Sequence, residues 1–295
     1  MTRVFIEASG GMTSGYIIQN LKRAGATVIA SDISKDNHSL ALSDEFILMP
    51  SSSTDGIRLI LENAIKKHNV DLVIPSLDET LLDWAHIADS TNLNISISPI
   101  ETISTFCDKW KAFKFFKDNE INTPDTSINP KYPFFKPRRG RGGSGIFTNE
   151  NIQKLPEDYI CQEYIKGQEY TVDCLFDDNG VLIYCIPRKR IKVASGKSVI
   201  GMTINHSGII KEIVKFSKLI VFKGMINFQC IENERGVFFI EVNPRLAGGM
   251  ALGIAATENW FNLVIENIVN KKSIKPKVEP IFPLTMYRYF HEVFA

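Results

Sequence analysis

Residues 225–249 read Met-Ile-Asn-Phe-Gln-Cys-Ile-Glu-Asn-Glu-Arg-Gly-Val-Phe-Phe-Ile-Glu-Val-Asn-Pro-Arg-Leu-Ala-Gly-Gly. Apolar stretches flank the Glu-Arg-Gly tripeptide, which predicts strands at 225–232 and 237–243 joined by a three-residue loop that ends in glycine. That register pairs Asn233 with Val237, and therefore Gln229 with Glu241. Asn243 lies two residues beyond Glu241 and shares its face of the strand. The segment therefore predicts three oxygen-bearing side chains on one side of a hairpin.

Oxygen ligands gathered in this way are typical of a magnesium site, so the predicted metal ligands are Gln229, Glu241 and Asn243. Arg245 follows the second strand and could reach the oxygens of a phosphoryl group during its transfer. The alternative is a polar strand face turned to solvent, but such a face usually carries lysine, threonine or serine. We therefore predict catalytic roles for Arg245 and Asn243.

A second motif lies upstream, where a basic loop at 138–145 contains four glycines. Such a loop lets backbone amides wrap around phosphate oxygens, which makes Gly142, Gly143 and Ser144 candidate phosphate ligands. The strand 132–136 places Lys136 at the mouth of this loop. The loop lacks the Gly-Lys-Ser/Thr ending of a Walker A motif. Nucleic acid binding is the alternative, but no aromatic platform lies nearby.

Around these motifs the chain changes character. Residues 1–100 alternate short apolar strands with helices, which predicts a small α/β domain with a parallel sheet. Residues 101–168 and 169–295 contain runs of strands with segregated helices, typical of α+β units. The principal expected elements are strands at 3–8, 27–33, 46–49, 72–75, 159–164, 169–177, 180–191 and 284–289, and helices at 57–68, 106–119, 208–222 and 254–269.

Taken together, these motifs resemble the ATP-grasp superfamily, in particular its carbamoyl-phosphate-synthase-like, carboxylate–amine ligase branch. Residues 229–245 resemble the metal-binding hairpin of that family, and residues 162–172 resemble its adenine hinge. Asp108-Lys109 and Phe135-Lys136-Pro137 match its two phosphate-contacting lysines. The resemblance covers all three segments, in the order of a Rossmann-like pre-ATP-grasp domain (1–100), a small lid lobe (101–168) and a large lobe with the metal site (169–295).

The resemblance implies an ATP site with assigned roles. Gln162 would face the adenine amino group, with Glu163 sharing that role, because the family often has an acid there. The backbone of Tyr164 and Ile165 would meet the edge of the adenine ring, and Glu169 would hold the ribose hydroxyls. Lys109, Lys136 and Mg²⁺ or Mn²⁺ would hold the phosphates, with Gln229 and Glu241 also contacting the nucleotide. Gln229 replaces a carboxylate at the first metal position, so Glu241 would be the main anionic ligand.

Members of this family phosphorylate a carboxylate with ATP and couple the acyl phosphate to an amine. We therefore expect an ATP-dependent, ADP-forming ligase that makes an amide or peptide bond, with a small-molecule acid and amine as partners. The alternatives are a carboxylate or carbamate kinase and a catalytically silent nucleotide-binding regulator. Candidate substrate contacts are Asp78 and Glu79 for an amine, Arg188 or Arg190 for a carboxylate, and the Gly248-Gly249 amides for the acyl oxygen. Helix capping is the alternative for Asp78.

The composition argues against several other classes of protein. Lys and Arg number 34 and Asp and Glu 33, so the formal charge is +1 and provides no overall field for nucleic acid or an anionic membrane. The chain contains no apolar run long enough for a membrane span. Its five cysteines show no Cys-x-x-Cys spacing, which argues against a disulfide framework or a structural zinc. We expect a cytoplasmic protein, and homodimerisation is left open.

Overall fold

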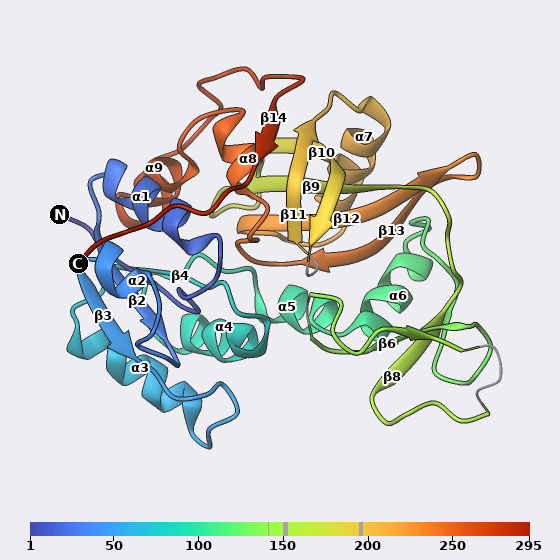
Figure 1. Cartoon of the computed structure of the whole chain (residues 1–295), viewed down its shortest axis with the longest axis horizontal. Coiled ribbons are helices and arrows are strands. Elements are labelled where there is room, and N and C mark those ends of the chain that lie inside the picture. Colours follow the sequence, from blue (N-terminus) through green and yellow to red (C-terminus); the bar gives the residue numbers. More distant parts are fainter. Residues whose placement is uncertain (141, 150–152, 195–196) are drawn as a thin grey trace.

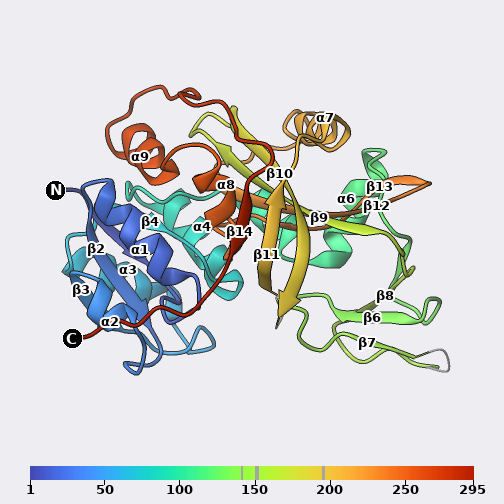
Figure 2. The same cartoon turned by 45° about the horizontal axis from the view of Figure 1, so that its top comes forward.

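The computed structural model describes residues 1–140, 142–149, 153–194 and 197–295, so Arg141 of the predicted glycine-rich loop lies outside the described residues. Three sheets follow one another along the chain, with helices packed against them. The four-stranded sheets lie at opposite ends of the molecule, and the six-stranded sheet lies between them (Figures 1 and 2). The prediction of a mixed α/β fold is thus confirmed. The boundaries predicted at residues 100 and 168 stay a prediction.

The first sheet is wholly parallel, in the order β3-β2-β1-β4. Its strands are β1 (Arg3–Ile6), β2 (Thr27–Asp32), β3 (Glu45–Leu48) and β4 (Leu72–Ile74), connected through α1 (Ser14–Arg23), α2 (Ser39–Leu42) and α3 (Ile57–Lys67). The 3₁₀ turn η1 (Asp78–Thr80), α4 (Leu81–Ser90) and α5 (Ile100–Phe106) follow. Alternate strand residues enter two different cores, as expected for a parallel sheet that is covered on both faces.

The cover of this sheet comes from both ends of the chain. Phe5 and Val73 pack with α3 and α4 on one face. On the other face Val4 and Ile74 share a core with α1 and with α9 (Trp260–Val264), which lies beside α1 in Figure 1. The core of the first sheet therefore includes residues that lie about 250 positions further along the chain.

The second sheet is small and antiparallel, in the order β5-β8-β6-β7. Its strands are β5 (Thr126–Ser127), β6 (Phe134–Pro137), β7 (Phe147–Thr148) and β8 (Tyr159–Gln162), preceded by α6 (Lys109–Asp118). The third sheet has the order β13-β12-β9-β10-β11-β14. Its strands are β9 (Gln168–Phe176), β10 (Leu182–Ala194), β11 (Lys197–Thr203), β12 (Gly224–Asn233), β13 (Gly236–Asn243) and β14 (Thr285–Tyr287).

The helices of this part are α7 (Ser207–Phe216), α8 (Ala251–Ala255) and α9, which continues into the π-helical turn η2 (Ile265–Val269). Two predicted helices are divided in the structure. The helix expected at 106–119 begins at Lys109 because Asp108 caps α6, accepting hydrogen bonds from the amides of Trp110 and Lys111. The helix expected at 254–269 is interrupted where Asn259 caps α9. Within the described residues, no helix is both long and apolar enough to cross a bilayer.

Candidate active site

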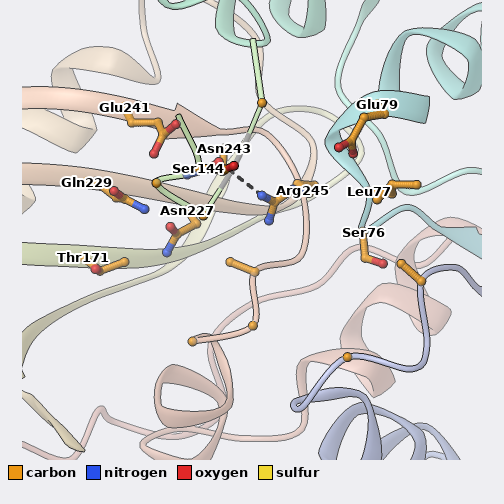
Figure 3. A pocket seen from close by; sticks show the side chains of 18 of the residues that line it. Ser76, Leu77, Glu79, Ser144, Thr171, Asn227, Gln229, Glu241, Asn243 and Arg245 are labelled. Carbon is orange, nitrogen blue, oxygen red and sulfur yellow. Dashed lines mark hydrogen bonds between the residues drawn. The ribbon is translucent and has the colours of Figure 1, made fainter. Parts of the chain in front are cut away.

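A cleft of about 1180 Å³ is lined by residues from all three sheets and from the loops between them. In Figure 3, Thr171, Asn227, Gln229 and Glu241 project from neighbouring strands of the six-stranded sheet, and Ser76 and Glu79 lie across from them. With one exception, Asp78, every side chain and glycine predicted to bind nucleotide, metal or substrate lines this cleft. The fold therefore brings together residues that span more than half of the chain.

The hairpin β12–β13 pairs Gln229 with Glu241 as predicted, although the turn differs from the prediction. Asn233 pairs with Gly236 rather than with Val237, so the turn has two residues between the strands. The register then shifts between Cys230 and Gln229, where β13 carries one extra residue, Ile240. This bulge restores the predicted pairing of Gln229 with Glu241 and, in the same register, places Asn243 opposite Asn227.

Lys109 lies at the first position of α6 and reaches the hairpin. Its ammonium is 3.3 Å from Oε1 of Glu241 and donates a hydrogen bond of 2.9 Å to the carbonyl of Gly140. The helix start is fixed by Asp108, whose carboxylate also accepts a 2.6 Å hydrogen bond from Arg138. Lys109 thereby connects the glycine-rich loop to the predicted metal ligands.

Lys136 on β6 is the second cation of the cleft, and only 6% of its surface is exposed. Its ammonium makes a single hydrogen bond within the described residues, of 3.5 Å, to the carbonyl of the bulge residue Ile240. Burial, with a smaller contribution from the charge of Lys109, lowers the pKa of Lys136 to about 8 against the opposing effect of Glu241. A buried ammonium with one long hydrogen bond fits a site that receives an anion.

We expect Lys136→Met to stabilise the protein in the absence of nucleotide while weakening ATP binding by tenfold or more. Below pH 8 the folded wild type holds a buried charge that the unfolded chain, with a lysine pKa near 10.4, solvates freely. That penalty, about 3 kcal/mol at pH 7, disappears as pH rises from 8 toward 10.4. Thermal unfolding and calorimetric ATP titration at pH 7 and pH 9 measure both effects.

The exposed Lys111→Met on the same helix as Lys109 is the matched control and should change neither quantity. A Lys136→Met variant that is destabilised at pH 7 and binds ATP normally would contradict the assignment of Lys136 as a phosphate ligand.

The glycine-rich loop and the hinge flank the two lysines. Gly142, Gly143 and Gly145 have φ between +68° and +73°, a region that other residues rarely adopt. A Cβ on Gly145 would also lie 2.7 Å from the hydroxyl of Tyr159. In the hinge, Gln162 donates its amide hydrogen to Thr126 Oγ1 (2.8 Å), which leaves its carbonyl oxygen as an acceptor.

The acidic residues of the hinge have partners within the protein. Glu163 forms a 2.6 Å ion pair with Arg235 at the tip of the β12–β13 hairpin. Glu169 pairs with Arg190 of the adjacent strand β10. Arg190 is one of the two arginines predicted to hold a substrate carboxylate. Its ion pair in this structure is with Glu169, the predicted ribose-binding residue.

Arg245 is held by Asp78, the residue that does not line the cleft. The Nε and Nη2 atoms of Arg245 donate to the two carboxylate oxygens of Asp78 at 2.8 and 2.6 Å. Nη2 also lies 3.3 Å from Oδ1 of Asn243. Figure 3 shows the contact between Arg245 and Asn243. Both oxygens of Asp78 accept hydrogen bonds from the guanidinium, so Asp78 orients Arg245. That Asp78 also binds a substrate amine stays a prediction.

Arg188, the other predicted carboxylate ligand, is buried in the cleft wall with 2% of its surface exposed. Its Nε and Nη2 atoms donate to Asp173 at 2.6 and 3.1 Å, and Asn227 donates to the same carboxylate at 2.8 Å. A Cβ on Gly249 would lie 2.1 Å from Nη2 of Arg188. A side chain at 249 would therefore displace the guanidinium of Arg188 from its present position.

Four further residues of the cleft were not predicted from the sequence. Thr171, Asn227 and Arg288 line it, and Asp173 holds Arg188 in its wall. A signal was present for Thr171 and Asp173, because Glu169, Thr171 and Asp173 alternate along an otherwise apolar strand and so share one polar face. Arg288 gave no such signal, since it lies beyond the short strand β14 in a segment without a recognisable motif. Only the pairing of β14 with β11 brings it to the cleft.

The predicted metal ligands provide some, but not all, of the oxygen atoms that a magnesium ion needs. Among the described residues, no cluster of three or more His, Cys, Asp or Glu side chains could hold a metal. Gln229, Glu241 and Asn243 provide one carboxylate and two amide oxygens on adjacent strands. Mg²⁺ binds in many proteins through one or two carboxylates, with waters and substrate phosphates completing the shell. The residues therefore fit an ion that arrives with a nucleotide.

Comparison with known proteins gives a consistent result. Residues 156–289 match the family described as "ATP-grasp in the biosynthetic pathway with Ter operon". The chain is 26% identical to the tyramine–L-glutamate ligase of Methanocaldococcus jannaschii over 227 residues, which cover 74% of this chain and 69% of the relative. It is also 26% identical over 194 residues to an uncharacterised protein of the same organism, covering 59% of this chain but only half of that relative.

The fold comparison extends over nearly the whole chain. The ADP complex of N5-carboxyaminoimidazole synthetase from Staphylococcus aureus superposes with a TM-score of 0.76 at 16% identity. The match covers 96% of this chain and 81% of the synthetase. At this identity the structural likeness shows the fold alone. The recognition made from the sequence motifs is confirmed by the ATP-grasp family match over residues 156–289 and by the similarity to a ligase relative.

Proposed function

We propose that this chain, whose residues 156–289 match an ATP-grasp family model and which is similar to a ligase relative, is an ATP-grasp enzyme that acts as a magnesium-dependent, ADP-forming ligase. It would activate a carboxylate as an acyl phosphate and join it to an amine, forming a C–N bond. The observation that carries the proposal is Lys136, a buried ammonium with one long hydrogen bond, in the same cleft as Lys109, Glu241 and Arg245. Such a concentration of cations around one carboxylate suits a triphosphate and its metal.

Each group has a distinct part in the proposed reaction. Lys136 and Lys109 bind the phosphates, and Gly142, Gly143 and Ser144 cover them with backbone amides. The Gln162 carbonyl accepts from the adenine amino group, and Glu169 binds the ribose. Gln229, Glu241 and Asn243 would hold the metal, which supplies charge neutralisation on the phosphates. Arg245, oriented by Asp78, meets the charge that develops as the phosphoryl group moves to the substrate carboxylate.

We place the adenosine between the hinge residues 162–165 and the six-stranded sheet. Residues 1–100 would form a Rossmann-like pre-ATP-grasp domain, with a lid lobe at 101–168 and a large lobe at 169–295. Closure of the lid would exclude water from an acyl phosphate that hydrolyses readily. We propose Mn²⁺ as an alternative metal. We also propose a cytoplasmic location and a homodimer for the protein. The tyramine–L-glutamate ligase suggests amino acids as the substrate class.

A screen for ADP release tests this function. The protein is incubated with Mg-ATP and pools of carboxylic acids, with and without pools of amines, and products are identified by mass spectrometry. We expect ADP release that requires both an acid and an amine, with one new amide per ADP. Release with an acid alone would indicate a carboxylate kinase. ATP binding without turnover under any pool would indicate a nucleotide-binding regulator.

A further inference from the structure

Two arginines meet at the turn that follows Arg245. Arg288 donates a 2.6 Å hydrogen bond from Nη2 to the carbonyl of Gly248, and Nη2 of Arg188 occupies the space next to Gly249. The strand β10 supplies Arg188, and the chain just after β14 supplies Arg288. Both side chains and both glycines line the cleft. This corner of the cleft, formed by Arg188, Arg288 and the turn 248–249, is called the arginine corner below.

The arginine corner carries more positive than negative charge. Arg188 is neutralised by Asp173, with which it makes a buried bidentate pair. Arg288 has only carbonyl partners in the described part of the chain, Ser198 at 2.9 Å and Gly248 at 2.6 Å. Burial and then the nearby charge of Arg188 lower the pKa of the Arg288 guanidinium, while the charge of Asp173 opposes this shift. Two guanidinium groups and the one carboxylate of Asp173 therefore leave a surplus of one positive charge beside the cleft.

A short chain of contacts connects the arginine corner to the site of phosphoryl transfer. Asp173, which holds Arg188, also accepts a hydrogen bond from Asn227. Asn227 is paired across the hairpin with Asn243, whose side chain contacts Arg245. The sequence Arg245-Leu246-Ala247-Gly248 then returns along the backbone to the carbonyl that Arg288 binds. The corner thus lies within a small molecule's length of Arg245.

We propose that the arginine corner is a second anion subsite, which binds a carboxylate of the acid substrate other than the one that is phosphorylated. The substrate class would be dicarboxylic acids, including acidic amino acids. This proposal rests on the proposed ligase function, since it assigns the specificity of the same site. The guanidinium fork can bind a carboxylate or a phosphate. A carboxylate suits the corner better than a phosphate ester, because the surplus of one positive charge matches a monoanion.

The test compares acids of equal length. Succinate, glutarate and adipate are titrated calorimetrically against butanoate, pentanoate and hexanoate, without nucleotide and with Mg²⁺ and a non-hydrolysable ATP analogue. 4-Phosphonobutanoate is the probe for a phosphate-like second anion. We expect at least one dicarboxylate to bind wild-type protein tenfold or more tightly than its monocarboxylate counterpart, and more tightly than the phosphonate. Arg288→Met should abolish this preference and leave monocarboxylate binding unchanged.

Arg58→Met is the matched control, because it removes the same charge from an exposed ion pair with Asp83 and should preserve the preference. If a thermal melt shows that Arg288→Met does not fold, the test uses the dicarboxylate preference of the wild type and of Arg288→Lys. The lysine variant should retain part of the wild-type preference. Equal binding of mono- and dicarboxylates, tighter binding of the phosphonate, or no binding of any dicarboxylate to wild type would overturn the subsite. If the subsite proposal fails but ADP release still requires an amine, the ligase function remains supported. Dicarboxylate preference without such release refutes the ligase function alone.

Discussion

Replacing Arg245 by alanine is expected to lower kcat by two to three orders of magnitude while changing the affinity for ATP little. The guanidinium is fixed by Asp78 and lies next to Asn243, so it is already oriented before substrate arrives. A preorganised charge that meets developing negative charge is worth roughly 3–4 kcal/mol in the transition state, or about that loss in rate. An interaction made mainly in the transition state lowers kcat more than it weakens ground-state binding.

The measurement combines steady-state turnover with calorimetric ATP binding. Arg245→Lys should restore little, because an ammonium cannot pair with both oxygens of Asp78 and still face the reacting phosphate. Asp78→Asn keeps the shape but weakens the pair, and we expect about a tenfold loss in kcat from poorer orientation. Arg58→Ala, which disrupts an exposed pair elsewhere, should be silent. A collapse of ATP affinity with kcat preserved would make Arg245 a ground-state nucleotide contact.

Glu241→Gln should lower turnover by about three orders of magnitude, since metal-ion stabilisation of transferring phosphoryl groups is worth several kcal/mol. Glu241 is the sole carboxylate of the predicted metal set, and the same side chain lies 3.3 Å from Lys109. The amide keeps the size of the side chain but removes the negative charge that attracts both Mg²⁺ and the Lys109 ammonium. We expect the Mg²⁺ concentration for half-maximal activity to rise at least tenfold.

The matched control is Glu234→Gln, which lies exposed at the turn of the same hairpin and should leave the Mg²⁺ dependence unchanged. Thermal melts of both variants establish that the fold is intact. If Glu241→Gln retained wild-type activity with an unchanged Mg²⁺ optimum, the metal would have to be bound elsewhere and the hairpin assignment would be wrong.

Local patterns predicted the hairpin and the motifs well, because their residues are close in sequence. The pairing of Gln229 with Glu241 illustrates the limit, since the two-residue turn and the bulge at Ile240 compensate for each other. Neither feature is visible in alternating hydrophobicity alone. The strand β11 was missed altogether.

The contacts that define the cleft are of another kind. Asp78 and Arg245 are separated by 167 positions, and Arg288 reaches Gly248 through the edge strand β14. Nothing in the immediate neighbourhood of these residues specifies their partners. Helix capping was a reasonable alternative for Asp78, because an acid at the start of a helix has that role far more often than a long-range one. Such pairs become visible only when the sheets are assembled.

The shared cover of the first sheet has a consequence for how the polypeptide acquires its structure. During synthesis β1, β2 and β4 emerge first, but part of the apolar layer on one of their faces, including Trp260 and Phe261, is translated much later. Until then Val4 and Ile74 lack part of their native neighbours, so the N-terminal segment should remain sensitive to proteases on the ribosome. Contacts between such distant segments also raise the contact order and slow folding. The cover of the first sheet should therefore be completed only after α9 has been translated and docks against it.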